Sequence, residues 1–215
     1  MTTLDAPVGI VDQTESLSSE LKRSTSELHT LAERSPRMAS LVRGQMGRDG
    51  YAAHLGQLYL LHEGLERALA EFCASEPRVC RVIDESQFQA PNALEDLAYL
   101  GVSLGTFRAC GPVERFLSHI ESCAQECPWK LLGMHYVLEG SKNGGRFLAK
   151  IVRKAYDLPE GMGDRYMDPY GDAQGELWAR FKASMDALEL ASDERQDVLD
   201  GAHDIFEMMV ELGSL

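Results

Sequence analysis

The stretch Leu131–Lys154, LLGMHYVLEGSKNGGRFLAKIVRK, has apolar residues at helical spacing but also contains four glycines. The spacing predicts one long helix over residues 129–156. A glycine inside a helix costs about 1 kcal/mol relative to alanine, so this sequence gives up several kcal/mol of helix stability. Two explanations stay open: the small residues permit close helix crossing or a kink, or they let a flat ligand approach the backbone closely. The glycines concerned are Gly133, Gly140, Gly144 and Gly145.

The same helical periodicity dominates the rest of the chain. Period-two alternation never lasts and β-branched residues are sparse, so we expect an all-α fold, a single-domain bundle of about seven helices. Residues 1–15 show no periodicity and are expected to form a flexible arm before a domain of residues 16–215. The other helices are predicted from Ser18 to Ser35, from Asp49 to Glu76, and over 93–104, 113–124, 175–190 and 193–212.

Composition and charge exclude several classes of protein. Hydrophobic residues make up 44% and charged residues 26%, which is typical of a folded globular chain. The formal net charge of -13 repels nucleic acids and anionic lipid surfaces. No apolar run approaches the ~18 residues that cross a bilayer, and the first twenty residues do not resemble a secretion signal. We therefore expect a cytoplasmic protein with no nucleic-acid or membrane partner.

The five cysteines are odd in number and form no pair of CxxC motifs. Without a secretion signal, this pattern favours free thiols. Cys123 and Cys127 stand four residues apart and could share a metal ion, but no second pair of ligands has a zinc-like spacing. Structural packing is the simpler interpretation. The cysteines are Cys73, Cys80, Cys110, Cys123 and Cys127.

His29 is the candidate metal ligand among six histidines. Glu33 follows it by four residues on the predicted helix, where a carboxylate can accept one ring N–H and leave the other nitrogen free for a metal. A single histidine on a helix is more often an ordinary surface or core residue. The pattern alone therefore leaves both interpretations open.

Six segments together resemble the heme oxygenase family. They cover residues 17 to 212 in the order and spacing of that family. They are LKRSTSELHTLAER (21–34), RGQMGRDGYAAHLGQLYLLHEGLE (43–66), ALEDLAYLG (93–101), YVLEGSKNGGRF (136–147), FKASMDALEL (181–190) and AHDIFEMMVE (202–211).

The resemblance implies a heme site and a role for each matched residue. His29 is then the axial ligand of the heme iron, with Glu33 as its partner. The catalytic positions of the distal helix are Gly140, Ser141 and Gly144, and the positions around the macrocycle and its propionates are Lys22, His135, Gly145 and Lys182. Ser141 stands where many members have an aspartate, and His135 where others have a tyrosine.

The activity that the resemblance implies is oxidative ring opening of heme. Heme is both substrate and cofactor, O2 is consumed, and biliverdin, carbon monoxide and ferrous iron are the products. Because the chain lacks a GxGxxG motif after a predicted strand, electrons are expected from an external ferredoxin or reductase.

Three alternatives belong to other classes. A non-catalytic heme carrier or sensor would keep His29, and Ser141 favours it. A relative acting on another small molecule, such as the thiamin-salvage enzymes, would need acidic and cysteine residues in the bundle centre and no histidine at position 29. A purely structural helical protein would explain neither the glycines nor the histidine.

Overall fold

The computed structural model describes residues 15–103, 105 and 107–215, and within them it contains helices and no strand. This confirms the all-α prediction, while residues 1–14 of the expected arm lie outside the described residues. The α-helices are α1 (Leu17–Ser24), α2 (Ser26–Glu33), α3 (Pro36–Val42), α4 (Arg48–Ser75), α5 (Ala90–Tyr99), α6 (Gly111–Glu126), α7 (Trp129–Tyr156), α8 (Gln174–Asp186) and α9 (Ser192–Gly213). Three 3₁₀ turns are η1 (Val79–Arg81), η2 (Glu85–Gln87) and η3 (Gly171–Ala173).

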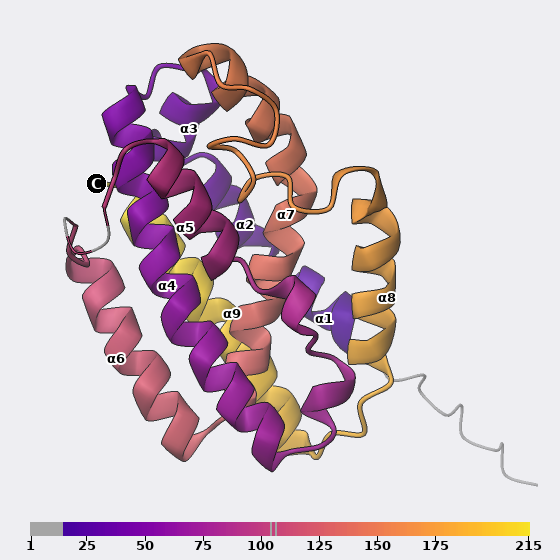
Figure 1. The fold of residues 1–215 in the computed structure, drawn as a ribbon. Helices are drawn as coiled ribbons and strands as arrows, with labels where there is room; N and C mark the ends of the chain where they lie inside the picture. Colours follow the sequence, from indigo (N-terminus) through magenta and orange to yellow (C-terminus); the bar gives the residue numbers. More distant parts are fainter. Residues whose placement is uncertain (1–14, 104, 106) are drawn as a thin grey trace, which may run out of the picture.

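The long helices α4, α6, α7 and α9 lie side by side and form the body of the bundle (Figure 1). α5 packs on α4, and α8 flanks α7 together with α1 (Figure 1). The larger part of the core lies between α4, α6, α7 and α9, and a second cluster joins α3, α4, α5 and the end of α7. α4 and α7 therefore contribute to both parts of the core.

α7 and α9 cross at very short range. A Cβ atom added to Gly133 would lie 1.9 Å from the carbonyl oxygen of Val198, and one added to Gly201 would lie 2.0 Å from that of Lys130. Only glycine permits such an approach of two backbones. The two helices run in the same direction, upward in Figure 1.

Thr25 divides the first predicted helix into α1 and α2, and Ser35 begins α3, a helix that was not predicted. The helix is interrupted at Thr25. The Thr25 hydroxyl group donates to the carbonyl of Leu21 at 2.7 Å, and this local bond competes with regular helix geometry. Ser35 and Pro36 end α2 as expected, but they also begin α3: the Ser35 hydroxyl accepts from the amide of Met38, and Pro36 takes the first helical position.

Other boundaries differ from the predictions by a few residues. α5 begins at Ala90 and ends at Tyr99, well before residue 104, because Gly101 adopts a positive φ of 83° that stops the helix. α8 ends at Asp186 rather than at residue 190. The bounds of α7 are those predicted.

The expectation of five free thiols is wrong for two of them. Cys73, near the end of α4, and Cys80, in η1, form a disulfide across a Cα–Cα distance of 5.0 Å. The turn at Pro77 reverses the chain and brings them together, which a count of cysteines does not reveal. The other three remain free, and no cluster of three or more His, Cys, Asp or Glu in the described ranges could hold a metal ion.

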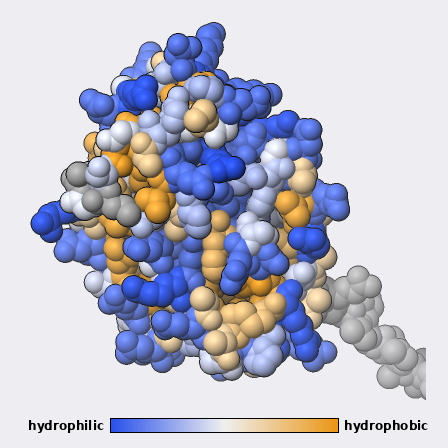
Figure 2. Space-filling view, in the orientation of Figure 1, coloured by the Kyte–Doolittle hydropathy of each residue, from blue (hydrophilic) through white to orange (hydrophobic). Residues whose placement is uncertain are grey.

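The surface is mostly hydrophilic on the face shown in Figure 2, with apolar residues gathered in narrow strips. None of the helices in the described segments is long and apolar enough to cross a membrane.

Candidate functional site

His29 lies on the exposed side of α2. The side chain is 56% exposed, and Nδ1 lies 3.7 Å from Oε2 of Glu33, which is longer than a hydrogen bond but close enough for attraction. The imidazole ring and the ring of Phe206 in α9 are arranged edge to face, with 5.7 Å between ring centroids. An accessible imidazole held between a carboxylate and an aromatic ring is suited to binding a metal through one nitrogen.

α2 as a whole is poorly covered by the rest of the polypeptide. It has no buried residue, whereas each of the other eight α-helices in the described chain has at least one. Leu31 is 54% exposed, and Leu28 and Ala32 are only partly buried. A globular helix normally buries its apolar stripe, so α2 presents an apolar surface that the protein itself does not cover.

The second half of α7 carries an open stripe. A Cβ atom added to Gly144 would meet no atom within 4 Å, and Phe147, three residues later, is 61% exposed. Gly140, one turn before Gly144, faces the Trp178 ring of α8 at 3.2 Å from its would-be Cβ. Ser141 is exposed, and its hydroxyl group donates to the carbonyl of Leu138 at 2.7 Å. Backbone at Gly144 is therefore accessible to a flat ligand.

Gly145 belongs to a different face of the helix. Its added Cβ would lie 2.1 Å from the carbonyl oxygen of Met167, so the residue is glycine because a neighbouring loop passes against it. Close packing thus accounts for Gly133 and Gly145, whereas no part of the described chain crowds Gly144, as the ligand explanation requires.

α9 relates the α2 surface to the α7 stripe. Gly201 packs on Lys130 near the start of α7, and the two helices then continue in the same direction. Phe206, which contacts His29, lies further along α9, toward the level of the glycine-rich half of α7. Figure 1 shows α2 behind α4 and α7. The shared neighbour α9 therefore brings His29 to the same end of the bundle as the open stripe.

Lys22 and Lys182 lie near one junction between helices. The backbone amide and hydroxyl of Ser18 in α1 donate to the Asp186 carboxylate of α8 at 2.7 and 2.8 Å. Lys22 follows Ser18 by one turn, and Lys182 precedes Asp186 by one turn. The Lys182 ammonium also lies 5.6 Å from the Trp178 ring centre, next to Gly140. The structure thus places both cations within one turn of the same α1–α8 contact.

His135 is not on the open stripe. Its ring is buried, Nε2 lies 3.0 Å from the side-chain oxygen of Gln87, and the rings of Phe88 and Phe181 pack edge-on against it. Burial lowers the pKa of His135 well below its ordinary value, and the nearby Lys142 charge adds to this. A neutral His135 therefore fastens α7 to η2.

Sequence analysis missed a buried ion pair beside the candidate site. Glu139 and Lys142 face inward from α7, one turn apart, with only 1% and 4% of their side chains exposed. Their spacing within an apolar helix was a visible signal, since a charged pair on a buried face needs an explanation. Their other partners, Gln87 and Tyr170, are distant in sequence.

Comparison with known proteins relates this arrangement to one family. The sequence model described as heme oxygenase matches residues 15–213. The chain belongs to the heme oxygenase family.

Individual relatives agree with this membership. Human heme oxygenase 1 is 28% identical over 204 residues, covering 92% of this chain and 70% of the human protein. The structure of heme oxygenase from Leptospira interrogans has a TM-score of 0.82 and 25% identity, and covers 93% of this chain and 99% of that one. Heme oxygenase 2 from Synechocystis, solved in complex with heme and NO, has a TM-score of 0.86 at 22% identity, with 93% and 84% of the two chains covered.

The residues present here fit a heme. The macrocycle is flat and apolar, and the exposed Leu31, the exposed Phe147 and the accessible backbone of Gly144 match those properties. Iron takes imidazole nitrogen, which His29 offers. Two clefts of about 300 and 330 Å³ are lined by other residues, around Asp204 and around Arg180. Neither cleft includes His29 or Gly144, so the residues that suit a heme lie on the α2 and α7 surfaces instead.

Proposed function

We propose that this protein is a heme oxygenase, which opens the heme ring oxidatively to biliverdin, carbon monoxide and ferrous iron with O2 and external electrons. One observation carries the proposal: an accessible His29 on an uncovered helix lies at the same end of the bundle as the open stripe of α7. Membership of the heme oxygenase family over residues 15–213 supports it.

The α2 surface would hold the iron. A nitrogen of His29 is the proposed ligand, and the nearby Glu33 carboxylate favours the orientation of the ring in which an N–H points toward it. The ring of Phe206 limits rotation of the imidazole. When bound, heme supplies the iron redox chemistry and the activation of O2.

The α7 stripe would cover the other face of the heme. Gly144 lets the backbone approach the ring, and Gly140 lies one turn earlier on the same side, next to Trp178. Ser141, whose hydroxyl oxygen retains acceptor capacity, can order water there. Lys22 and Lys182 are proposed to pair with the propionates. Gly145 and His135 are proposed to act through the position of α7, since both face its packed side.

Electrons would come from a separate ferredoxin or reductase. In the described part of the chain every regular element is a helix or 3₁₀ turn, whereas nicotinamide and flavin sites of the Rossmann type need a parallel sheet.

A heme carrier or sensor is the second candidate. The observation that favours it is the hydroxyl of Ser141, which bonds to the carbonyl of Leu138 instead of standing free on the stripe. This candidate shares the site and differs only in lacking turnover.

Hemin titration followed by reduction in air tests the proposal. We expect a sharp Soret band that saturates at one heme per chain, then decays to the broad red absorbance of biliverdin when ascorbate or a ferredoxin–reductase couple is added. A band that persists would support the carrier, and the lack of any saturable band would refute both candidates.

His29→Ala tests whether His29 is the iron ligand. The side chain is half-exposed, so we expect the fold to remain while axial ligation and turnover are lost. Added imidazole should restore the Soret band. His203→Ala, on α9, is the matched control and should behave as the unaltered protein. Full heme degradation by His29→Ala without imidazole would contradict the assignment.

A further inference from the structure

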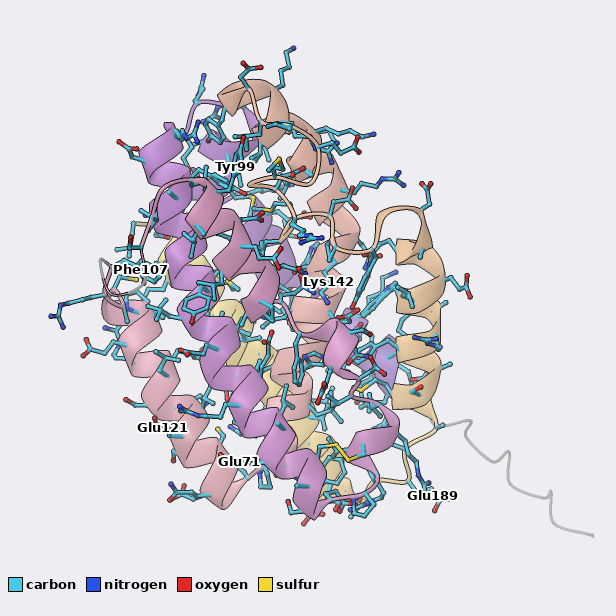
Figure 3. All side chains as sticks on the ribbon, viewed as in Figure 1. Glu71, Tyr99, Phe107, Glu121, Lys142 and Glu189 are labelled. Atoms are coloured by element: carbon cyan, nitrogen blue, oxygen red, sulfur yellow. A yellow bond between two sulfur atoms is a disulfide. The ribbon has the colours of Figure 1, made fainter. Side chains whose placement is uncertain are left out.

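Lys142 follows Ser141 directly, yet its side chain is buried whereas Ser141 is exposed. Its Nζ donates to Oε2 of Glu139 at 2.5 Å, to the carbonyl oxygen of Gln87 at 2.7 Å and to the hydroxyl oxygen of Tyr170 at 2.9 Å. These three bonds use all three protons of the ammonium group. Figure 3 shows Lys142 in the middle of the molecule, where α7 meets the segments around it.

Stability alone does not explain this ion pair. Removing two charges from water is expensive, and buried ion pairs replaced by apolar residues of similar size often leave a protein equally stable or more so. Burial lowers the pKa of Lys142, and Glu139 opposes that effect. What the pair supplies is a fixed position for the Lys142 side chain, because hydrogen bonds to charged groups are directional and hold the ammonium group at one place.

The three partners come from three separate segments. Glu139 is in α7, Gln87 is in η2, and Tyr170 lies just before η3. The bonds therefore fix the rotation of α7 at residue 142 against two segments outside it. A helix tied at one side chain can still swivel, so further contacts matter.

Two neighbouring contacts complete the attachment. His135, two turns earlier, meets the side chain of the same Gln87, and Gly145, three residues later, packs on Met167 in the segment that leads to Tyr170. The packed side of residues 135–145 is thus held at three successive levels. Gly140 and Gly144 lie on the other side, so any rotation released at Lys142 would shift them.

We propose that Lys142 is a positioning residue that sets the rotation of the glycine-rich segment of α7 and thereby the in-plane seating of the heme. The inference rests on the proposed function. The propionates set the rotation of a heme only approximately, because its other edges resemble one another closely. Small differences in backbone contact can therefore shift that rotation in the site. That rotation decides which meso edge is opened and hence which biliverdin isomer forms.

The test compares a charge-free pair with a surface control. Lys142→Met alone leaves Glu139 buried and unpaired, so it risks loss of folding. Glu139→Gln/Lys142→Met removes both charges at similar volume and is the variant expected to fold. Lys150→Met removes an exposed lysine from the same helix and serves as the control.

Three measurements report on different parts of the inference. In the apo-protein, amide hydrogen exchange over residues 143–147 should be about tenfold faster in the double variant and unchanged in Lys150→Met. In the ferric cyanide complex, heme methyl NMR shifts should reveal a second seating. Chromatography of the products should show a minor biliverdin isomer raised several-fold.

The outcomes separate this inference from the proposed function. Exchange, seating and isomer ratio that match the unaltered protein in a folded double variant would overturn the role of Lys142. If the unaltered protein binds hemin but does not degrade it, the proposed activity fails, while exchange and methyl shifts still decide the role of Lys142. If it binds no hemin, both proposals fail.

Discussion

At Gly133 a Cβ atom would lie 1.9 Å from a backbone oxygen of α9, whereas at Gly144, eleven residues along the same helix, it would meet nothing within 4 Å. The first region of α7 lacks side chains because another part of the protein occupies that space. The second lacks them and leaves the space accessible. The reason for a glycine in a helix therefore depends on what lies beside it. Gly144 and Gly145 are adjacent, yet the first faces open space and the second packs against Met167.

Gly133→Ala should have the largest effect, because both backbones at the α7–α9 crossing would have to move. We expect a loss of about 3 kcal/mol or more in the free energy of unfolding, measured by urea denaturation. Gly175→Ala on α8, where an added Cβ meets nothing within 4 Å, is the control and should be neutral or stabilising. A loss below about 1 kcal/mol in Gly133→Ala would show that the crossing is adaptable.

Gly144→Ala should separate stability from binding. The free energy of unfolding should stay the same or rise by up to about 1 kcal/mol, because alanine is the better helix former. Hemin affinity should fall about tenfold, since the methyl group enters the open stripe. Gly145→Ala should lower stability by about 2 kcal/mol through its contact with Met167. If both substitutions changed stability and hemin affinity equally, Gly144 and Gly145 would not lie on an open and a packed face of α7.

Acidification should reveal the packed side of the bundle. Burial lowers the pKa of His54 to about 4 and that of His135 well below its ordinary value. As the pH falls below about 6.5, these histidines become protonated in the unfolded chain but stay neutral in the folded chain. The free energy of unfolding therefore decreases by up to about 1.4 kcal/mol per pH unit for each histidine.

Asp96 acts in the opposite direction, because burial raises its pKa to about 6 and its proton stabilises the folded state at lower pH. Between pH 7 and pH 6, therefore, the change in folding stability comes mainly from the histidines and only to a small extent from Asp96. Urea midpoints measured across this range should fall less steeply in His135→Gln than in the unaltered protein. An unchanged slope in His135→Gln would mean that His135 is not buried in solution.

Ser141→Ala should have the smallest effect. It removes an exposed hydroxyl bonded to the Leu138 carbonyl, so the free energy of unfolding should change by no more than about 0.5 kcal/mol. Turnover should fall about threefold if the hydroxyl orders water on the stripe. Unchanged turnover would mean that the backbone and water suffice there.

The all-α class and the bounds of α7 follow from periodicity, a local pattern. The spacing of His29 and Glu33 left two interpretations open, and the resemblance of residues 21–34 to heme oxygenases selected His29 as the candidate ligand. The rest depends on distant partners. Ser35 and Pro36 fit both the end of one helix and the start of another, and the disulfide of Cys73 with Cys80 requires the turn at Pro77. The glycines could not be sorted because Val198 and Met167, which distinguish them, are remote in sequence.

The absence of buried residues in α2 also bears on how the protein responds to its ligand. A helix of eight residues with so little buried surface gains little free energy from staying folded, so α2 should open locally more often than the bundle around it. A ligand that binds only the closed form stabilises it by mass action. A ligand seated on the α2 surface would then complete a part of the hydrophobic core that the polypeptide leaves open, and α2 would become fully ordered only with that ligand bound.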